Sequence, residues 1–343
     1  MSEAKTVKFI PPQLATTVAE APEGGEWLHE IKFDGYRAEI VIAEHRARVF
    51  TRSGADWTDR FRHIADAALK IPCRSAIIDG EAVVLDDKGV SNFSKMQNAM
   101  GSGEGEVIFY AFDLLELDGL DFRRLPLIRR KEFLVTLLSM YKGGSWIQCA
   151  DHIQGNGGTF FQSACDHNLE GIISKKADAP YRSGRSTTWR KVKCSKQQEF
   201  VVGGWQPRSD DPADLGSLLV GFYKDSAFQF AGKVGTGFDA KTRARILREL
   251  QPLKRAFDPF FETPREVRKS AYWVDPKMVV RVKFTEFTDD GLLRHATFQG
   301  TRHDKPAEQI RLEVPRPTPP PGLIAISRNR WRSAARRKDT RRG

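Results

Sequence analysis

The sequence predicts an α+β protein of two domains, with antiparallel sheets in the first domain and a small β-barrel in the second. The chain has 343 residues, 40% hydrophobic and 29% charged, which is enough for two cores in an ordinary folded protein. Up to residue 197, apolar segments of strand length are interspersed with longer segments of helical period. Five short strand signals and one helical segment follow.

The first domain is expected over residues 21–197, after a flexible N-terminus at 1–20 that contains Pro11 and Pro12. Strands are expected at 36–41, 47–51, 75–85 and 107–114. Helices are expected at 58–69, 127–140 and 157–167. This mixture is typical of an α+β domain built on antiparallel sheets.

The second domain is expected over residues 198–314. Its strand signals lie at 199–205, 217–224, 228–234, 278–287 and around 293–298, and a helix is expected at 239–250. Five short strands with one interposed helix are what an oligonucleotide-binding (OB-fold) barrel requires. Residues 315–343 then form a proline-rich linker and a basic tail.

Two function classes are disfavoured by composition. No apolar run approaches the ~18 residues of a membrane span, and the N-terminus lacks an apolar signal core, so a cytoplasmic location without membrane contact is expected. The four cysteines (Cys73, Cys149, Cys165 and Cys194) contain no Cys-x-x-Cys pair. They are therefore interpreted as free thiols rather than as a zinc site or a disulfide scaffold.

The segment 29–37 is the most informative part of the chain. Lys32 lies two residues before an Asp34-Gly35 turn signal, so a strand, a tight turn and a second strand are expected. A lysine at such a junction can act as a nucleophile when burial and neighbouring cations favour its neutral amine. By itself the tetrapeptide fits an ordinary hairpin with a solvated lysine better than a nucleophilic site.

Further motifs follow this lysine in a fixed order, at residues 51–54, 78–81, 109–115, 170–175 and 189–193. Together with 27–37 they resemble the ordered motifs of the covalent nucleotidyltransferases, and specifically the ATP-dependent DNA ligases of the bacterial end-joining type. The resemblance spans residues 11–314. It implies a nucleotidyltransferase (adenylation) domain followed by an OB-fold domain, with ATP and Mg²⁺ (or Mn²⁺) as cofactors and nicked double-stranded DNA as substrate.

The resemblance also implies roles for individual residues. Lys32 would be the nucleophile that carries AMP, and Phe112, otherwise a plausible core residue, would stack on adenine. Glu81 would lie near the ribose and a metal ion, and Glu170 near the metal, because carboxylates are ligands that Mg²⁺ prefers. Lys191 and Lys193 project from one face of a strand, where a phosphate would relieve their repulsion.

The remaining candidates lie around the nucleotide. Glu30 and Ile31 are expected at the adenine edge, and Arg37, Arg52 and Arg185 near the ribose and phosphates, where a planar guanidinium binds oxygens bidentately. Arg302 and Lys305 belong to a charged segment at 302–305 that resembles the family's motif for closing on the triphosphate. Each alone could be a surface residue.

The sequence is therefore interpreted as an ATP-dependent DNA ligase that seals 5′-phosphate/3′-hydroxyl nicks through a lysyl-AMP intermediate in DNA repair or end joining. A monomer associated with the bacterial nucleoid is expected, with a DNA-end-binding protein as a candidate partner. An RNA ligase or an mRNA-capping guanylyltransferase would use the same lysine. An NAD-dependent ligase is disfavoured, because neither a nicotinamide-binding segment nor a four-cysteine zinc site is found. A non-enzymatic OB-fold adaptor is least favoured, because no expected catalytic position is missing.

The basic tail gives a first prediction. Residues 328–343 hold eight basic residues against one aspartate, or +7 of the net +11. Truncation after Val314 should weaken binding to nicked DNA and flatten its salt dependence, by about 0.9 in log–log slope for each phosphate that the tail neutralises. Affinities measured at several salt concentrations for full-length and truncated protein check this, and identical slopes would leave the tail without a role in binding.

Overall fold

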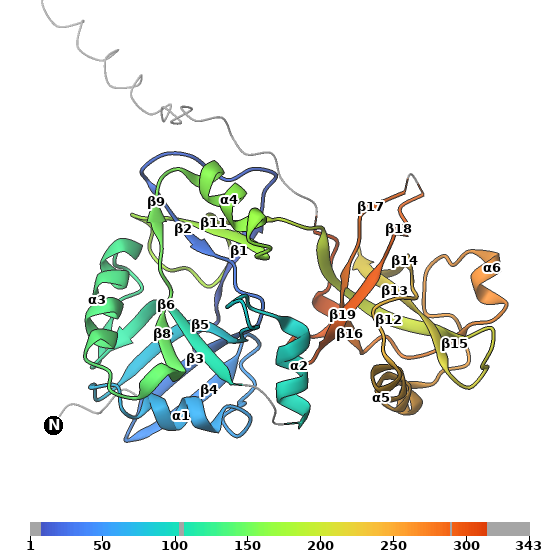
Figure 1. The fold of residues 1–343 in the computed structure, drawn as a ribbon, viewed down its shortest axis with the longest axis horizontal. Helices are drawn as coiled ribbons and strands as arrows, with labels where there is room; N and C mark the ends of the chain where they lie inside the picture. The colour runs from blue at the N-terminus through green and yellow to red at the C-terminus, as the bar shows by residue number, and fades with distance from the viewer. Residues whose placement is uncertain (1–7, 103–105, 289, 314–343) are drawn as a thin grey trace, which may run out of the picture.

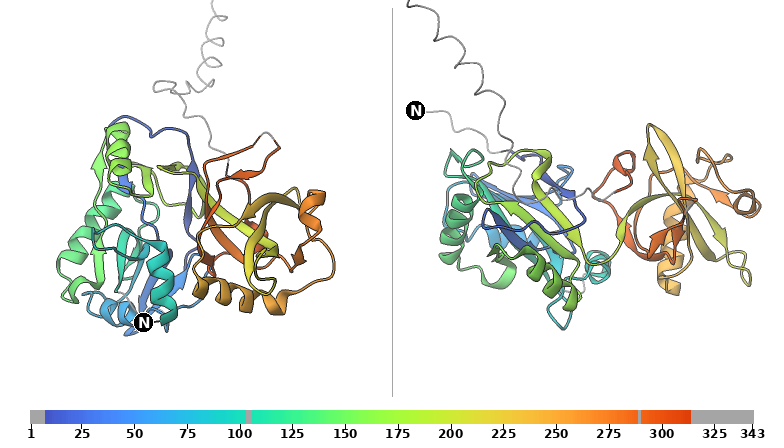
Figure 2. Two further views of the ribbon diagram at one scale, coloured as in Figure 1. Left: turned by 45° about the vertical axis from the view of Figure 1, so that its right-hand side comes forward. Right: turned by 90° about the horizontal axis from the view of Figure 1, so that it is seen from above.

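The computed structural model describes residues 8–102, 106–288 and 290–313. Two bodies lie side by side in the ribbon views, with residues 8–193 in one and the strands from β12 onward in the other (Figures 1 and 2). The expected linker and tail at 315–343 lie outside the described residues. No helix among the described residues is both long and apolar enough to cross a membrane.

The first body contains two sheets. One has the order β4 (Arg46–Thr51), β3 (Tyr36–Ala43), β5 (Ala76–Val84), β6 (Val107–Leu117) and β7 (Leu120–Asp121), with β8 (Ile147–Cys149) beside β6. The other has the order β1 (Gln13–Thr17), β11 (Gly184–Lys193), β10 (Gly171–Lys176), β2 (Trp27–Ile31) and β9 (Ile153–Gln154). Antiparallel pairs predominate, as predicted, but β1 pairs with β11 and β6 with β8 in parallel.

Among the described residues of this body, four α-helices accompany the sheets: α1 (Arg62–Ala68), α2 (Phe93–Ser102), α3 (Leu127–Ser139) and α4 (Gly157–Asp166). A short 3-10 helix, η1, spans Gly144–Trp146. Helix α3 packs against β6, and α4 packs against β10. A smaller apolar cluster, which includes Phe112, Tyr181 and Trp189, joins the two sheets.

The crossing from β2 to β3 determines where Lys32 lies. Both strands form as expected on either side of the Asp34-Gly35 turn, but they belong to different sheets. Strand β2 pairs with β10, whereas β3 pairs with β4 and β5. Residues 32–35 therefore pass from one sheet to the other, which places Lys32 between the sheets rather than at the tip of an exposed hairpin.

The second body is the expected OB-fold-type domain. Its main sheet has the order β14 (Ala227–Val234), β13 (Leu215–Lys224), β12 (Gln197–Pro207), β16 (Val279–Lys283) and β19 (Thr297–Arg302). A bridge between Thr236 and Thr297 connects the end of β14 to β19 and so closes the sheet on itself. Smaller elements complete the body: β15 (Tyr272–Trp273), β17 (Glu286–Phe287), β18 (Leu293–Arg294), α5 (Ala240–Leu250), η2 (Gln251–Leu253), α6 (Arg265–Arg268) and η3 (Ala307–Gln309).

The structure differs from the sequence predictions in several places. The expected flexible N-terminus contains β1, whose pairing with β11 is a tertiary contact that no local pattern shows. Helix α1 begins at Arg62 because the preceding residues form turns, with the amide of Phe61 donating to the carbonyl of Trp57. The last two expected strands each divide, into β16 with β17 and into β18 with β19.

The prediction of four free thiols was wrong for two cysteines. Cys165 at the end of α4 and Cys194 after β11 form a disulfide, with a sequence separation of 29 residues and Cα atoms 5.2 Å apart. Their proximity comes from the packing of α4 beside the sheet, which sequence spacing does not report. Cys73 and Cys149 are free.

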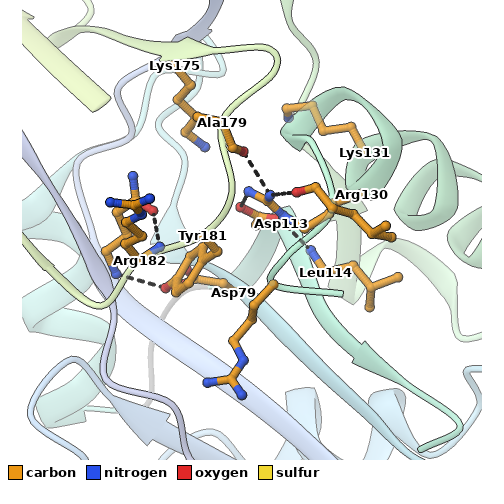
Figure 3. Close-up of polar contacts among 12 residues, drawn as sticks. Asp79, Asp113, Leu114, Arg130, Lys131, Lys175, Ala179, Tyr181 and Arg182 are labelled. Atoms are coloured by element: carbon orange, nitrogen blue, oxygen red, sulfur yellow. Dashed lines mark hydrogen bonds and ion pairs between the residues drawn. The ribbon is translucent and has the colours of Figure 1, made fainter. Parts of the chain in front are cut away.

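A buried ion pair connects α3 to β6. Arg130 binds both carboxylate oxygens of Asp113 at 2.7 and 2.8 Å, and neither side chain is exposed (Figure 3). Arg130 also donates to the carbonyls of Leu125 and Ala179, at 2.6 and 3.1 Å. The guanidinium therefore fixes the strand residue that follows Phe112.

Replacing Arg130 with Met should lower the free energy of unfolding by about 3–5 kcal/mol, because Asp113 would remain buried without its cation. Urea denaturation followed by circular dichroism measures this change. The neighbouring Arg129 is exposed on the same helix, so Arg129→Met should change stability by less than about 1 kcal/mol. Equal effects of the two substitutions would contradict a stabilising role for the buried pair.

Candidate active site

A cavity of about 410 Å³ lies between the two sheets of the first body and is completed by residues of the second. All thirteen residues singled out from the sequence line it: Glu30, Ile31, Lys32, Arg37, Arg52, Glu81, Phe112, Glu170, Arg185, Lys191, Lys193, Arg302 and Lys305. The structure thus brings together side chains that are spread over more than 270 residues of sequence.

Lys32 lies at the end of β2, directly opposite the start of β10. Its amide donates to the carbonyl of Gly171 at 2.9 Å, and its ammonium lies 2.5 Å from a carboxylate oxygen of Glu170. The antiparallel register, in which Ile31 pairs with Ile172, brings these two residues together. Glu170 is buried, whereas the Lys32 side chain is 17% exposed and reaches the cavity. The acid is thus placed to accept a proton from this amine.

One end of the cavity is aromatic and carries buried charges. Phe112 is buried against Trp189 with their rings 6.1 Å apart. The Lys175 ammonium lies 4.1 Å from both ring centroids, and the Arg37 guanidinium lies 4.5 Å from that of Phe112. A planar base can stack on such a ring or on the guanidinium plane.

Glu30 lies beside this aromatic end, with a buried lysine on each carboxylate oxygen. Lys131 is 2.7 Å from Oε1 and Lys175 is 2.6 Å from Oε2. Burial alone would raise the pKa of Glu30, but the two lysines lower it more strongly, so the carboxylate is ionised. Burial lowers the pKa of Lys175 to about 8, against the attraction of Glu30.

Arg37 is engaged within the first body. Its guanidinium binds Asp79 through two contacts of 2.6 Å, and Asp79 also accepts from the Tyr181 hydroxyl at 2.8 Å. Arg185, by contrast, is exposed and donates to the carbonyl of Ala15 at 2.9 Å. Arg52 lies between these extremes, partly buried at the turn after β4. Of the three arginines, Arg185 is thus the most accessible to a ligand.

Lys191 and Lys193 share one carboxylate. Glu313, the last described residue, lies 2.7 Å from the Lys191 ammonium and 3.2 Å from that of Lys193. Burial, together with the neighbouring Lys193, lowers the pKa of Lys191 to about 7, and the two lysines hold the pKa of Glu313 well below its ordinary value. Glu313 thus occupies the position between the lysines where an oxyanion was expected.

Residues of the second body close over the cavity. Lys305 pairs with Glu199 of β12 at 2.7 Å, and burial lowers its pKa to about 8. Arg302 pairs with Asp304 at 2.8 Å and donates to the carbonyl of Gly35 at 3.0 Å, three residues after Lys32. An ion pair between Arg281 and Asp34 adds a second link between the bodies.

Two carboxylates could serve a metal ion. Glu170 lies against Lys32, and Glu81 faces Arg37 across the β3–β5 pairing. Burial raises the pKa of Glu81 to about 7, although Lys32 and Arg37 oppose this shift. No group of three or more His, Cys, Asp or Glu side chains suited to a metal occurs among the residues that the structure describes.

Sequence reasoning missed five charged residues of this site: Lys131, Lys175, Glu199, Arg281 and Glu313. Lys175 stands within a motif that was recognised, so its position alone could have drawn attention to it. The other four lie outside the recognised motifs, and only tertiary packing brings Glu199, Arg281 and Glu313 to the cavity and Lys131 to Glu30.

This fold and lysine-centred cavity define a two-domain nucleotidyltransferase architecture, and comparisons with known proteins specify the family. Residues 11–193 match the ATP dependent DNA ligase domain, and residues 212–305 match the ATP dependent DNA ligase C terminal region. The chain belongs to the ATP-dependent DNA ligase family.

Individual relatives support the assignment. The chain is 37% identical over 319 residues to the multifunctional non-homologous end joining protein LigD of Pseudomonas aeruginosa, covering 91% of this chain and 38% of that protein. It is 36% identical over 309 residues to a LigD repair protein of Mycobacterium tuberculosis, covering 88% and 40%. The chain thus spans about two fifths of the length of these curated relatives. A solved structure described as mycobacterial DNA ligase D complexed with ATP and MES has a TM-score of 0.67 at 33% identity, covering 90% of this chain and 98% of that one.

The position of Glu313 gives a prediction about anion binding. Replacing Glu313 with Gln should strengthen the binding of tripolyphosphate by about tenfold, because the anion would no longer displace a charged competitor from the two lysines. Isothermal titration calorimetry measures the affinity. The exposed Glu308 provides the matched control, Glu308→Gln, which should bind like the wild type. An unchanged affinity in the Glu313 variant would show that its carboxylate does not compete with phosphates.

Proposed function

We propose that this chain is an ATP-dependent DNA ligase that seals nicks between a 5′-phosphate and a 3′-hydroxyl through a covalent lysyl-AMP on Lys32. The observation that carries the proposal is the cavity itself. In it, Lys32 contacts the buried carboxylate of Glu170 at 2.5 Å, and the lining also includes aromatic rings and the pair Lys191 and Lys193. Family membership and the likeness to the LigD proteins support the same reaction.

In the first step, the Lys32 amine attacks the α-phosphorus of ATP. The nitrogen–phosphorus bond forms, the bond to the pyrophosphate oxygen breaks, and Glu170 is placed to take the proton that the ammonium gives up. Lys191 and Lys193 would hold the α-phosphate after Glu313 withdraws, and Lys305 would reach the leaving phosphates. These contributions are positioning and charge neutralisation, on which such transfers mainly depend.

Two further transfers complete the reaction. The 5′-phosphate of the nick attacks the lysyl-AMP, so that the nitrogen–phosphorus bond breaks and a new phosphate anhydride forms. The 3′-hydroxyl then attacks the activated phosphate, a phosphodiester forms and AMP leaves. DNA must reach Lys32 for both steps, so the contacts of Arg302 with Gly35 and of Arg281 with Asp34 would have to separate after adenylation.

The carboxylates present fit a magnesium (or manganese) ion. Mg²⁺ is commonly bound by one or two carboxylates together with substrate phosphates and water, so Glu170 and Glu81 could supply the protein ligands without a third acidic residue. When bound, the ion would act as a Lewis acid on the phosphate oxygens. Glu170 would then have to release Lys32, which it contacts in the present arrangement.

The wider setting is part of the same proposal. Several relatives are named as end-joining proteins, which supports a role in DNA repair by end joining. A DNA-end-binding protein is proposed as a partner, and the nucleoid of a bacterial cell as the place of action. We propose that the chain acts as a monomer.

Lys32→Ala should abolish both the AMP adduct and nick sealing, because no other lysine replaces the one held against Glu170 in this geometry. Intact-mass spectrometry after incubation with ATP and Mg²⁺, followed by a sealing assay on nicked DNA, measures the two activities. Lys70→Ala, at an exposed site, should retain both. An adduct that persists in the Lys32 variant would refute the assignment, and sealing of nicked RNA instead of DNA would favour the RNA-ligase alternative.

A further inference from the structure

Helix α3 places a lysine next to the aromatic end of the cavity but outside the cavity lining. Lys131 lies beside Arg130 in the first turns of α3, and its ammonium reaches Oε1 of Glu30 at 2.7 Å. Both side chains are 2–3% exposed. Lys131 is not among the residues that line the cavity, whereas Glu30 and Lys175 are. Figure 3 shows Lys131 on the helix and Lys175 on the opposite side of the group.

Two buried lysines on one carboxylate are more than charge balance requires. One cation would neutralise Glu30, and burying a second ammonium costs free energy unless it serves some purpose. Lys175 has other favourable surroundings, since it lies over the rings of Phe112 and Trp189. Lys131 has no such aromatic neighbour among the residues that the structure describes, so its position is best explained by what it does to Glu30.

We propose that Lys131 is a positioning residue that fixes Glu30 as an obligate hydrogen-bond acceptor and thereby makes the site select a 6-aminopurine nucleotide over a 6-oxopurine nucleotide. The inference rests on the proposed function, because it assumes that a purine nucleotide occupies the cavity. Lys131 touches neither the base nor the reacting atoms and acts through Glu30 alone.

The selection follows from the chemistry of the two bases. An ionised carboxylate offers only acceptor oxygens, so it can receive a hydrogen bond from an exocyclic amino group. The carbonyl oxygen of a 6-oxopurine would face the same lone pairs without a proton between them, and a buried polar atom without a partner is strongly disfavoured. With a lysine on each oxygen, Glu30 can neither rotate freely nor take up a proton to become a donor.

The same turn of α3 also positions Phe112, whose ring lines the aromatic end of the cavity. Arg130 fixes Asp113, the residue after Phe112, through two hydrogen bonds between fully buried groups. Consecutive residues of α3 thus set the ring on which a base would stack and the acceptor that would read its edge. Because α3 packs on β6 outside the cavity, a substitution at Lys131 alters the acceptor without filling or emptying the nucleotide space.

The test compares ATP and GTP binding in a Lys32→Ala background, where no covalent transfer can interfere. In the parent protein ATP should bind more tightly than GTP. Lys131→Met should reduce this preference by about tenfold, because the buried ion pair that holds Glu30 is lost, with most of the change in the ATP affinity. Lys131→Arg, which retains the cation, should preserve the preference. The exposed Lys142 gives the matched control, Lys142→Met, with parental affinities.

A purely structural role would lower the melting temperature and leave the ratio of the two affinities unchanged, and that result would overturn the proposal. If Lys131→Met fails to fold, Glu30→Gln takes its place, because an amide can donate as well as accept and should admit GTP. A Glu30→Gln protein with an unaltered ratio would also overturn the proposal. The proposed ligase activity is judged separately, by the absence of an AMP adduct on the protein that retains Lys32.

Discussion

The structure depends on the neutralisation of many cations that are buried around one cavity. An ammonium or guanidinium removed from water is tolerated only when a carboxylate or a comparable acceptor lies beside it. Lys32 has Glu170, Lys305 has Glu199, and the Lys191–Lys193 pair has Glu313. A cavity equipped in this way can receive a highly charged phosphate ligand, because the protein carboxylates hold the cations in place until the ligand exchanges with them.

The carboxylates that pair with these cations come from both bodies of the molecule. Glu170 belongs to the first body and approaches Lys32 through the pairing of β10 with β2. Glu199 and Glu313 belong to the second body or to the segment that follows it. Exchange of Glu313 for a phosphate would therefore remove an attraction between the two bodies. If a nucleotide binds as proposed, its binding and the separation of the bodies would be coupled through shared cations, in addition to the contacts of Arg302 and Arg281.

Backbone geometry supports the same arrangement at two glycines. Gly171 has a φ of +146°, and a Cβ there would lie 2.0 Å from the carbonyl oxygen of Val192, so only glycine allows β10 to approach β11 beside Glu170. At Gly35 a Cβ would lie 2.1 Å from the carbonyl oxygen of Ala82. The chain therefore passes close to β5 immediately after the turn that follows Lys32, which keeps the lysine between the sheets.

The two-domain α+β architecture and most strand and helix positions could be predicted from local sequence patterns, and the thirteen candidate residues line one cavity. The fold prediction was confirmed because alternation and helical period are local signals and because the motif order carried a family resemblance. The chemical roles of the thirteen residues stay predictions. The folded structure was needed to show that β2 and β3 join different sheets, that Cys165 bonds to Cys194, and that Lys131 and Glu313 contact residues of the site. Such pairings arise from packing between distant segments, where each residue taken locally resembles any lysine, cysteine or glutamate on a surface.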